Sequence, residues 1–293
     1  MTAIATDGAL AGAMRRRSVG PPAARSVLMT VLGEYVMPRG GVVWQERLIA
    51  ALVTLGHTEQ TARQAVARST RDGWLSGERR GRRTRMAITP ETKHVLEEGR
   101  ERIFGFGRES TWDERWLVVV LRIPEERRRV RHHVRTRLAR AGMGSLGGGV
   151  WIAPHADREP LVADALRAAD ASAEAVSFMA GLGTLGRAED LLEAWDLDGL
   201  RAEYAGFLDR FDGARPRDGE ATFRTQTELV HAWRRIAFLD PDLPDELLPR
   251  DWPRRRAYEL FHRRHATWHG AAQDNFGRLD DGEPAPTRDR RTE

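Results

Sequence analysis

The stretch that most constrains this chain runs from Thr58 to Ile88, where a helical pattern is followed directly by a hairpin pattern rich in arginine. Thr58 is a favourable N-cap, because its hydroxyl can accept a hydrogen bond from a first-turn amide. Gly73 is a favourable helix stop, because glycine readily adopts the left-handed conformation. Between them, small residues recur with helical spacing and predict one face that packs closely on a neighbouring helix. That face comprises Ala62, Ala65, Val66 and Ser69.

The opposite face of this helix, and the hairpin after it, carry side chains suited to nucleic acid. Arginine and glutamine pair with guanine and adenine edges in the major groove, and arginine at a hairpin tip meets phosphates or a narrow minor groove. A solvated amphipathic helix with a basic surface loop is the plainer alternative. The predicted DNA-binding residues are Thr58, Gln60, Arg63, Gln64, Arg68, Arg71, Arg79, Arg80, Arg82, Arg83 and Arg85.

The residues on either side of this stretch complete a recognisable order of elements. Apolar spacing predicts a helix over 24–36 and another over 44–55, with a short strand at Val42 and Val43 between them. A further helix is expected from Pro90 to about Phe106. Three helices and a two-stranded wing are typical of a winged helix-turn-helix, with the third helix in the recognition position.

The middle of the chain alternates strand and helix patterns. The apolar run at 116–121 predicts a buried strand, and further strands are expected at 150–152 and 175–179. Helices are expected over 124–141 and 157–169. This order suggests a small ferredoxin-like domain of the split βαβ type. The glycine-rich segment 144–149 is interpreted as a flexible turn or bulge before the second strand.

The predicted fold class is α+β, with an N-terminal winged helix-turn-helix, a central ferredoxin-like domain and a C-terminal helical domain. The helical domain rests on the spacing of aromatic and leucine residues from about Glu189 onward. The expected boundaries are a disordered arm at 1–22, the winged helix with its linker helix at 23–108, the ferredoxin-like domain at 109–183, the helical domain at 184–270 and a disordered tail at 271–293.

Charge and composition narrow the function classes. The net charge is only +4, so positive charge is local, as expected for a DNA-binding module joined to other domains. There is no cysteine, which excludes disulfides, iron–sulfur clusters and thiol catalysis. No 18-residue apolar run is present, and the basic triplet at 15–17 lacks the apolar stretch of a secretory signal. We therefore expect a cytoplasmic protein with no membrane partner.

Two other clusters allow more than one interpretation. Seven arginines and two histidines crowd the helix expected over 124–141, either as a second contact for DNA or for the phosphates of a ligand, or as a solvated face. His262, His265 and His269 share one side of the last helix, and such spacing could hold a transition metal. No carboxylate joins them at matching spacing, so we interpret them as histidines at the edge of the core or at an interface. The sequence thus predicts no metal ligand, no cofactor and no catalytic residue.

Taken together, the motifs resemble those of the PaaX family of bacterial transcriptional repressors, over roughly residues 24–268. No single motif is decisive, but many occur in the same order. They include Gly33-Glu34-Tyr35-Val36, Pro38-Arg39-Gly40-Gly41, Asp72-Gly73-Trp74-Leu75, Gly149-Val150-Trp151-Ile152-Ala153-Pro154 and Leu239-Asp240-Pro241-Asp242-Leu243-Pro244.

The resemblance implies a homodimeric winged-helix repressor that binds a double-stranded operator and is released by a small effector, which in the founding members is an aryl-acetyl coenzyme A thioester. Effector-binding residues are unknown. The family's middle domain is similar to small CRISPR-associated nucleases with an aspartate after the first strand. Arg122 stands at that position here, so a non-enzymatic regulator is expected. A metal-dependent nucleic-acid hydrolase and a structural DNA-binding protein without effector remain as alternatives.

Overall fold

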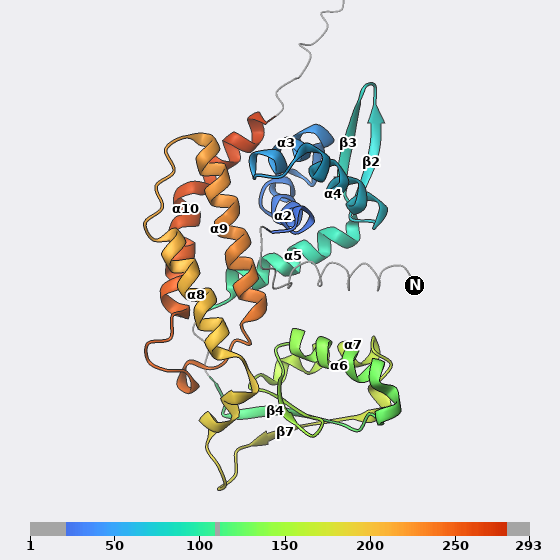
Figure 1. The fold of residues 1–293 in the computed structure, drawn as a ribbon, viewed down its shortest axis with the longest axis vertical. Coiled ribbons are helices and arrows are strands. Elements are labelled where there is room, and N and C mark those ends of the chain that lie inside the picture. The colour runs from blue at the N-terminus through green and yellow to red at the C-terminus, as the bar shows by residue number, and fades with distance from the viewer. Residues whose placement is uncertain (1–21, 109–111, 280–293) are drawn as a thin grey trace, which may run out of the picture. The chain divides into compact units, whose positions relative to one another are not determined.

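The computed structural model describes residues 22–108 and 112–279 (Figure 1). They form two compact units, each assembled from separate stretches of the chain. The first contains the described parts of 1–100 and 262–293 together with 214–231, and the second contains 101–213 and 232–261. The expected arm, apart from Pro22, and the tail after Leu279 lie outside the described residues. Within these described ranges, no helix is long and apolar enough to span a lipid bilayer.

The first unit opens with three helices that bury a shared apolar core. Their buried side chains include Leu28, Leu32, Leu48, Leu52 and Val66, which recur at helical spacing on each element. The expected elements over 24–71 are confirmed, and the first helix is extended by a π-helical and a 3₁₀ turn. The elements are α2 (Ala24–Val31), the turns Leu32–Val36 and Met37–Arg39, β1 (Val42–Trp44), α3 (Gln45–Thr54) and α4 (Glu59–Arg71).

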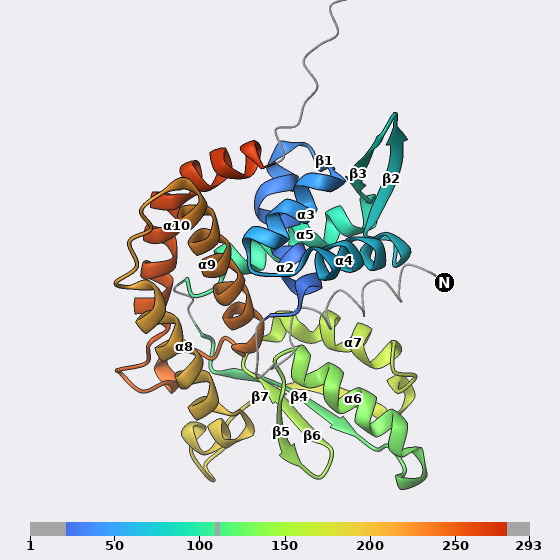
Figure 2. The same ribbon diagram turned by 45° about the horizontal axis from the view of Figure 1, so that its top comes forward.

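A hairpin and a long helix follow α4, as expected. Strands β2 (Leu75–Arg80) and β3 (Arg83–Ile88) pair antiparallel, and β1 pairs with the other edge of β3, which gives the order β1-β3-β2. Helix α5 spans Pro90–Gly105. In both ribbon views, α4 and the hairpin lie side by side (Figures 1 and 2).

The start of α9 and the end of α10 complete the first unit. α9 spans Gly219–Leu239 and α10 spans Arg254–Arg278. Tyr35 packs between Phe223 and Phe276, with ring centroids 5.0 and 5.1 Å away. The expected disordered tail was therefore wrong for residues 271–278, which belong to helix α10. Ala272 and Phe276 are buried there and continue the apolar stripe of the helix into a segment of mostly polar residues.

The second unit contains a four-stranded antiparallel sheet with the order β5-β6-β4-β7. Helices α6 and α7 cover one face of it (Figures 1 and 2). Their Val134, Leu138, Val162 and Leu166 pack on the strand residues. The elements alternate as strand, helix, strand, strand, helix, strand. They are β4 (Arg115–Leu121), α6 (Arg128–Arg140), β5 (Gly144–Gly147), β6 (Val150–Ala153), α7 (Glu159–Arg167) and β7 (Ala175–Gly181).

The glycine-rich segment 144–149 is not only a turn, which corrects our expectation. Gly144–Gly147 forms strand β5, paired with β6, and the expected irregularity is a register shift between Ser145 and Gly147. A side chain at Gly149 would place its Cβ 2.4 Å from the Leu121 carbonyl oxygen. Glycine is required at position 149 because β4 passes this closely. Strand β5 was not predicted from the sequence because glycine has a weak preference for strands.

The other face of the sheet carries a tryptophan cluster and leads into the C-terminal helices. Trp112 and Trp195 pack against Trp116, with ring centroids 5.3 and 6.4 Å away. A 3₁₀ segment (Ala188–Ala194) and α8 (Leu197–Phe211) follow. The helical C-terminal region is thus divided between the two units, whereas we expected one separate helical domain.

Candidate nucleic-acid interface

Helix α4 presents two chemically distinct faces. The Thr58 hydroxyl accepts a hydrogen bond from the Thr61 amide at 3.2 Å, which caps the helix as expected. Ala62, Ala65 and Val66 are buried against the other helices. Their small side chains let α4 pack closely, so that its opposite face stands out from the unit.

The exposed face of α4 carries polar side chains with no internal partner. Gln60, Gln64, Arg68 and Arg71 are all exposed, and their side chains make no hydrogen bond or ion pair with any residue that the structure describes. Arg63 differs, because its guanidinium binds Glu59 with Nη2 2.6 Å from Oε1. The four unpartnered side chains are therefore available to an external ligand, whereas Arg63 would first have to leave Glu59.

The turn after α4 joins the Asp72-Gly73-Trp74-Leu75 motif to Arg25 and Thr89, which our sequence analysis did not single out. The Arg25 guanidinium stacks on the Trp74 ring at 3.8 Å and pairs with Asp72 at 2.5 Å. The Thr89 hydroxyl donates to the Gly73 carbonyl at 2.7 Å. Since Gly73 has a φ of 76°, the chain reverses tightly there. These contacts hold the hairpin in a set position beside α4.

The arginines of the hairpin fall into two groups. Arg80 pairs with Glu78 at 2.9 Å, and the partly buried Arg83 stacks on Trp44 at 4.6 Å and approaches Glu46 at 3.5 Å. Arg82 and Arg85 are exposed, and their side chains have no partner among the described residues. Arg82 stands beside Gly81 at the tip. The tip thus presents the free guanidinium of Arg82, and Arg85 presents another farther along β3, opposite Glu78. Arg83 anchors the hairpin to β1 and α3.

A second basic surface lies on α6 in the other unit. Arg128, Arg129 and Arg135 are exposed there, while Arg131 binds the Ile123 carbonyl and Glu125, and Arg127 binds Glu174 and Asp170. This is the arginine-rich helix for which the sequence left two interpretations open. Its exposed guanidinium groups fit either of them, because the same atoms are available to phosphates and to water.

Arg122 occupies the position that would matter most for a nuclease. It follows β4 directly, its side chain is exposed, and its amide donates to the Glu174 carbonyl at 2.9 Å. A guanidinium cannot bind a divalent cation, which requires oxygen ligands at such a site. The end of β4 therefore lacks the carboxylate that metal-dependent cleavage would use at this point.

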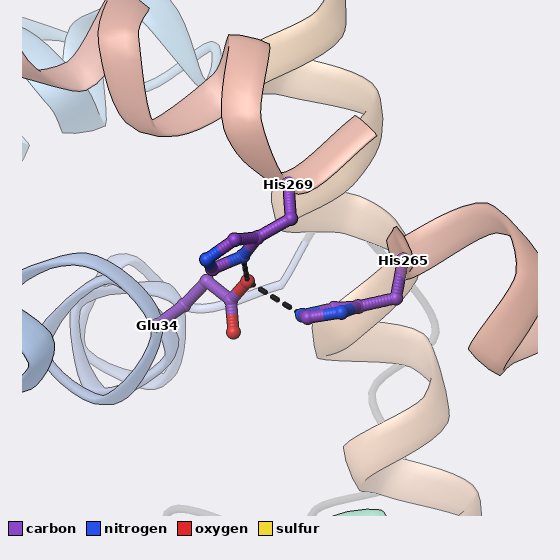
Figure 3. A group of neighbouring side chains, drawn as sticks. All are labelled: Glu34, His265 and His269. Atoms are coloured by element: carbon purple, nitrogen blue, oxygen red, sulfur yellow. Dashed lines mark hydrogen bonds and ion pairs between the residues drawn. The ribbon is translucent and has the colours of Figure 1, made fainter. Parts of the chain in front are cut away.

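The structure brings a carboxylate to the histidines of the last helix, which corrects our expectation that none joins them. Glu34 is 3% exposed, and its Oε1 accepts hydrogen bonds from His265 Nε2 at 2.8 Å and His269 Nδ1 at 2.9 Å (Figure 3). Gln226 Nε2 donates to the same oxygen at 3.0 Å. Burial raises the pKa of Glu34, but these hydrogen bonds and the charge of His265 outweigh it and lower the pKa to about 2.

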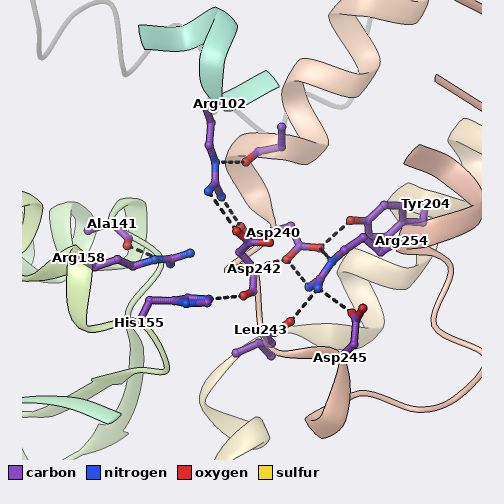
Figure 4. Close-up of polar contacts among 11 residues, drawn as sticks. Arg102, Ala141, His155, Arg158, Tyr204, Asp240, Asp242, Leu243, Asp245 and Arg254 are labelled. Carbon is purple, nitrogen blue, oxygen red and sulfur yellow. Dashed lines mark hydrogen bonds and ion pairs between the residues drawn. The ribbon is translucent and has the colours of Figure 1, made fainter. Parts of the chain in front are cut away.

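The Asp240-Pro241-Asp242 motif forms a buried polar cluster in the second unit. Asp240 pairs with Arg254, whose Nη2 lies 3.0 Å from Oδ1, and accepts a hydrogen bond from the Tyr204 hydroxyl at 2.6 Å (Figure 4). Arg102 reaches the carbonyls of Ala237 and Asp240, and the His155 ring contacts the Asp242 carbonyl at 2.5 Å. The motif's acidic residues therefore serve the packing of this unit.

An open pocket of about 390 Å³ lies near this cluster, at the start of α10. Trp252 lines it, and the indole nitrogen of Trp252 is buried without a hydrogen-bond partner among the described residues. Arg250, Arg255 and Arg256 also line it, together with the carboxylates Asp251 and Glu259, and Arg255 pairs with Glu259 at 3.3 Å. An aromatic surface beside guanidinium groups suits a ligand with an apolar part and an anionic part.

Comparisons with known proteins cover most of the chain. Three family models match in succession: "PaaX-like protein" at residues 23–90, "PaaX protein central Cas2-like domain" at 109–192 and "PaaX-like protein C-terminal domain" at 195–278. The chain is 27% identical over 251 residues to the transcriptional repressor PaaX of Escherichia coli (strain K12), covering 82% of this chain and 78% of that protein.

One solved structure has the same fold over most of its length. It is the uncharacterized protein Rv0674 from Mycobacterium tuberculosis, with a TM-score of 0.58 and 22% sequence identity. The match covers 86% of this chain and 98% of that one. At this level of identity the likeness concerns the fold alone.

Proposed function

The chain belongs to the PaaX family, and we propose that it is a transcriptional repressor that binds operator DNA through a winged helix-turn-helix at residues 23–108. One observation carries the proposal. The exposed face of α4 consists of glutamine and arginine side chains with no partner among the described residues, and the arginine-tipped hairpin lies beside it. Side chains of these types read base edges and grip phosphates.

In this proposal α4 enters the major groove and the β2–β3 wing reaches the flanking backbone. Gln60, Gln64, Arg68 and Arg71 contact bases or nearby phosphates, and Thr58 positions the helix start. Arg79, Arg80, Arg82 and Arg85 hold the flanking groove. Arg63, Arg80 and Arg83 make their contacts after exchanging Glu59, Glu78 and Glu46, respectively, for a phosphate.

We propose further that the repressor is a homodimer joined through the ferredoxin-like domain. The strand order and the alternation of strands and helices are those of a split βαβ fold. On the sheet face opposite α6 and α7, Val176 is 64% and Phe178 is 48% exposed. Apolar side chains of this size on a sheet face are characteristic of a protein interface. A two-fold dimer would then read two half-sites of a pseudo-palindromic operator.

The small effector is proposed to bind at the pocket beside Trp252. An acyl or aryl coenzyme A thioester has the apolar and anionic parts that Trp252 and its neighbouring arginines suit. The volume of about 390 Å³ admits the acyl part of such a ligand and leaves the nucleotide part at the open rim.

Fluorescence anisotropy tests the proposal. A labelled fragment from upstream of the protein's own gene is compared with a scrambled fragment, with and without a panel of acyl coenzyme A thioesters. We expect specific binding that one thioester releases, and Trp252→Ala should keep the DNA affinity while losing the response. Equal weak binding to both fragments would refute the repressor proposal. Specific DNA binding that no thioester releases would support the DNA-binding role and exclude these thioesters as the effector.

The competing hypothesis, a metal-dependent nucleic-acid hydrolase, is not favoured. Arg122 replaces the carboxylate expected after the first strand of the ferredoxin-like domain. Incubating the same labelled fragments with Mg²⁺ or Mn²⁺ distinguishes the two functions, since a repressor leaves both fragments intact.

A further inference from the structure

Glu34, His265 and His269 bring together the ligand atoms of a transition-metal site. The two histidines are four residues apart on α10, so they project from the same face of the helix. Glu34 comes from the π-helical turn after α2, 231 residues before His265. One carboxylate oxygen and one ring nitrogen from each histidine all lie within 4.8 Å of one another (Figure 3). Two imidazoles and a glutamate form a donor set that Zn²⁺ takes in proteins.

The distances between these atoms are close to those that a bound ion requires. Ligands at about 2.0–2.1 Å from a tetrahedral ion lie about 3.3–3.4 Å from one another. Glu34 Oε1 is 2.8 Å from His265 Nε2 and 2.9 Å from His269 Nδ1. These two pairs therefore need to open by only about half an ångström, which small rotations of the side chains supply, and the two histidine nitrogens lie within 4.8 Å of each other.

The charge of the cluster also favours a cation. Glu34 is buried, and no arginine or lysine of the described residues forms an ion pair with it. Its ion pairs are with His265 and His269, which carry a positive charge only when protonated. With both imidazoles neutral the buried carboxylate is costly, and a divalent ion bound by the two rings would supply the positive charge.

Gln226 offers a fourth ligand atom. It is fully buried, and its Nε2 lies 3.0 Å from Glu34 Oε1, while its Oε1 has no hydrogen-bond partner among the described residues. Rotating the amide by about 180° exchanges the two atoms and turns the oxygen toward the cluster. Coordination would then satisfy the buried oxygen, which has no partner in its present position, in exchange for the Nε2 hydrogen bond to Glu34.

We propose that Glu34, His265, His269 and Gln226 bind one Zn²⁺ or similar transition-metal ion, which cross-links the first helical segment to the C-terminal helix. Because these residues all belong to the first unit, the ion stabilises the packing of that unit. The His269 side chain is 38% exposed, which gives the ion a route to the buried carboxylate. This proposal does not depend on the proposed function, since the ion is detected without DNA.

The test is a titration of the full, untagged chain, stripped of metal, with Co²⁺ as a spectroscopic probe and Zn²⁺ by calorimetry. We expect one equivalent to bind, an intense visible Co²⁺ band typical of tetrahedral nitrogen and oxygen ligation, and a rise in Tm of roughly 5–10 °C at a free Zn²⁺ concentration about 100-fold above Kd. A wild-type chain that gives no band and binds no equivalent would overturn the proposal.

Variants locate the ion. His269→Asn and Glu34→Gln should each weaken binding by at least about 100-fold and abolish the Tm rise, since each removes a ligand. His94→Asn removes an exposed histidine on α5 and should leave both unchanged. Circular dichroism of the metal-free variants separates loss of binding from loss of folding. If the band survives in a folded His269→Asn variant, the ion is bound elsewhere and the assignment is wrong.

Discussion

Individual arginines in the first unit divide into those bound within the protein and those facing outward. Arg25 and Arg83 stack on tryptophan rings and pair with acids, so they hold the hairpin in place. Arg68 and Arg82 are exposed and make no side-chain contact of this kind with the described residues. A guanidinium with no internal partner loses no contact within the protein when it binds phosphate or guanine. Substitutions of these residues should therefore have the largest effects on DNA affinity.

Arg68→Ala or Gln64→Ala should weaken operator binding by about 1–3 kcal/mol and relax sequence preference, because a bidentate contact to a base is lost. Anisotropy titrations with operator and scrambled fragments measure both effects. Arg224→Ala, on the exposed surface of α9, is a matched control that should change neither. If Arg68→Ala leaves both affinities unchanged, α4 is not the recognition helix.

Arg82→Ala should weaken operator and scrambled DNA by similar factors, because the wing tip contacts phosphates and not base edges. The plot of log K against log salt should become shallower by about one unit, since one phosphate contact is lost. Binding titrations at several salt concentrations measure this slope. A loss confined to operator DNA would show instead that the wing reads sequence.

Asp240→Ala should destabilise the protein by about 3–5 kcal/mol, because Arg254 is left buried without its principal partner. Urea denaturation followed by circular dichroism measures the change. Asp251→Ala provides the control, since Asp251 pairs with Arg201 at the exposed surface and should have a much smaller effect. Similar losses in the two variants would show that the buried pair has no special structural role.

Among the elements, those with strong local signals were predictable from the sequence. The Thr58 cap, the small apolar face and Gly73 define α4, and the apolar run at 116–121 defines β4. Strand β5 was missed because three of its four residues are glycine or serine, and its pairing depends on β6. The end of α10 was missed because the burial of Phe276 depends on Tyr35 and Phe223, which are distant in sequence.

The candidate DNA-binding surface was predictable in part, because helical periodicity is also a local signal in the sequence. Periodicity alone separates the exposed face of α4 from its buried face. It cannot reveal that Arg83 contacts Glu46 or that Arg25 stacks on Trp74. Nor can spacing along one helix reveal that Glu34 reaches His265 and His269, because only the folded chain brings these segments together.

The exposed sheet face of the second unit yields a prediction about assembly. Phe178→Asp should convert the proposed dimer to a monomer, because a buried charge at an apolar interface is unfavourable. Size-exclusion chromatography with light scattering measures the mass. Leu161→Asp, at an equally exposed apolar residue on α7, should leave the dimer intact. A wild-type monomer, or an unaffected Phe178→Asp dimer, would exclude this interface.

For the molecule as a whole, the net charge of +4 hides strong local contrasts. Residues 59–85 contain eight arginines and three acidic residues, and α6 supplies a second basic surface in the other unit. Either surface would attract DNA at low salt. The proposed repressor requires that α4, and not α6, lies on the operator.

Because the chain has no cysteine, a single introduced thiol can decide between these surfaces. Ala67 on α4 and Ala139 on α6 are both exposed, so Ala67→Cys and Ala139→Cys can each be coupled to a DNA-cleaving iron chelate. We predict that the chelate on residue 67 cuts the operator at discrete positions within each half-site, while the chelate on residue 139 cuts weakly or not at all. Cleavage from residue 139 with none from residue 67 would contradict the assignment of α4 as the DNA-reading helix.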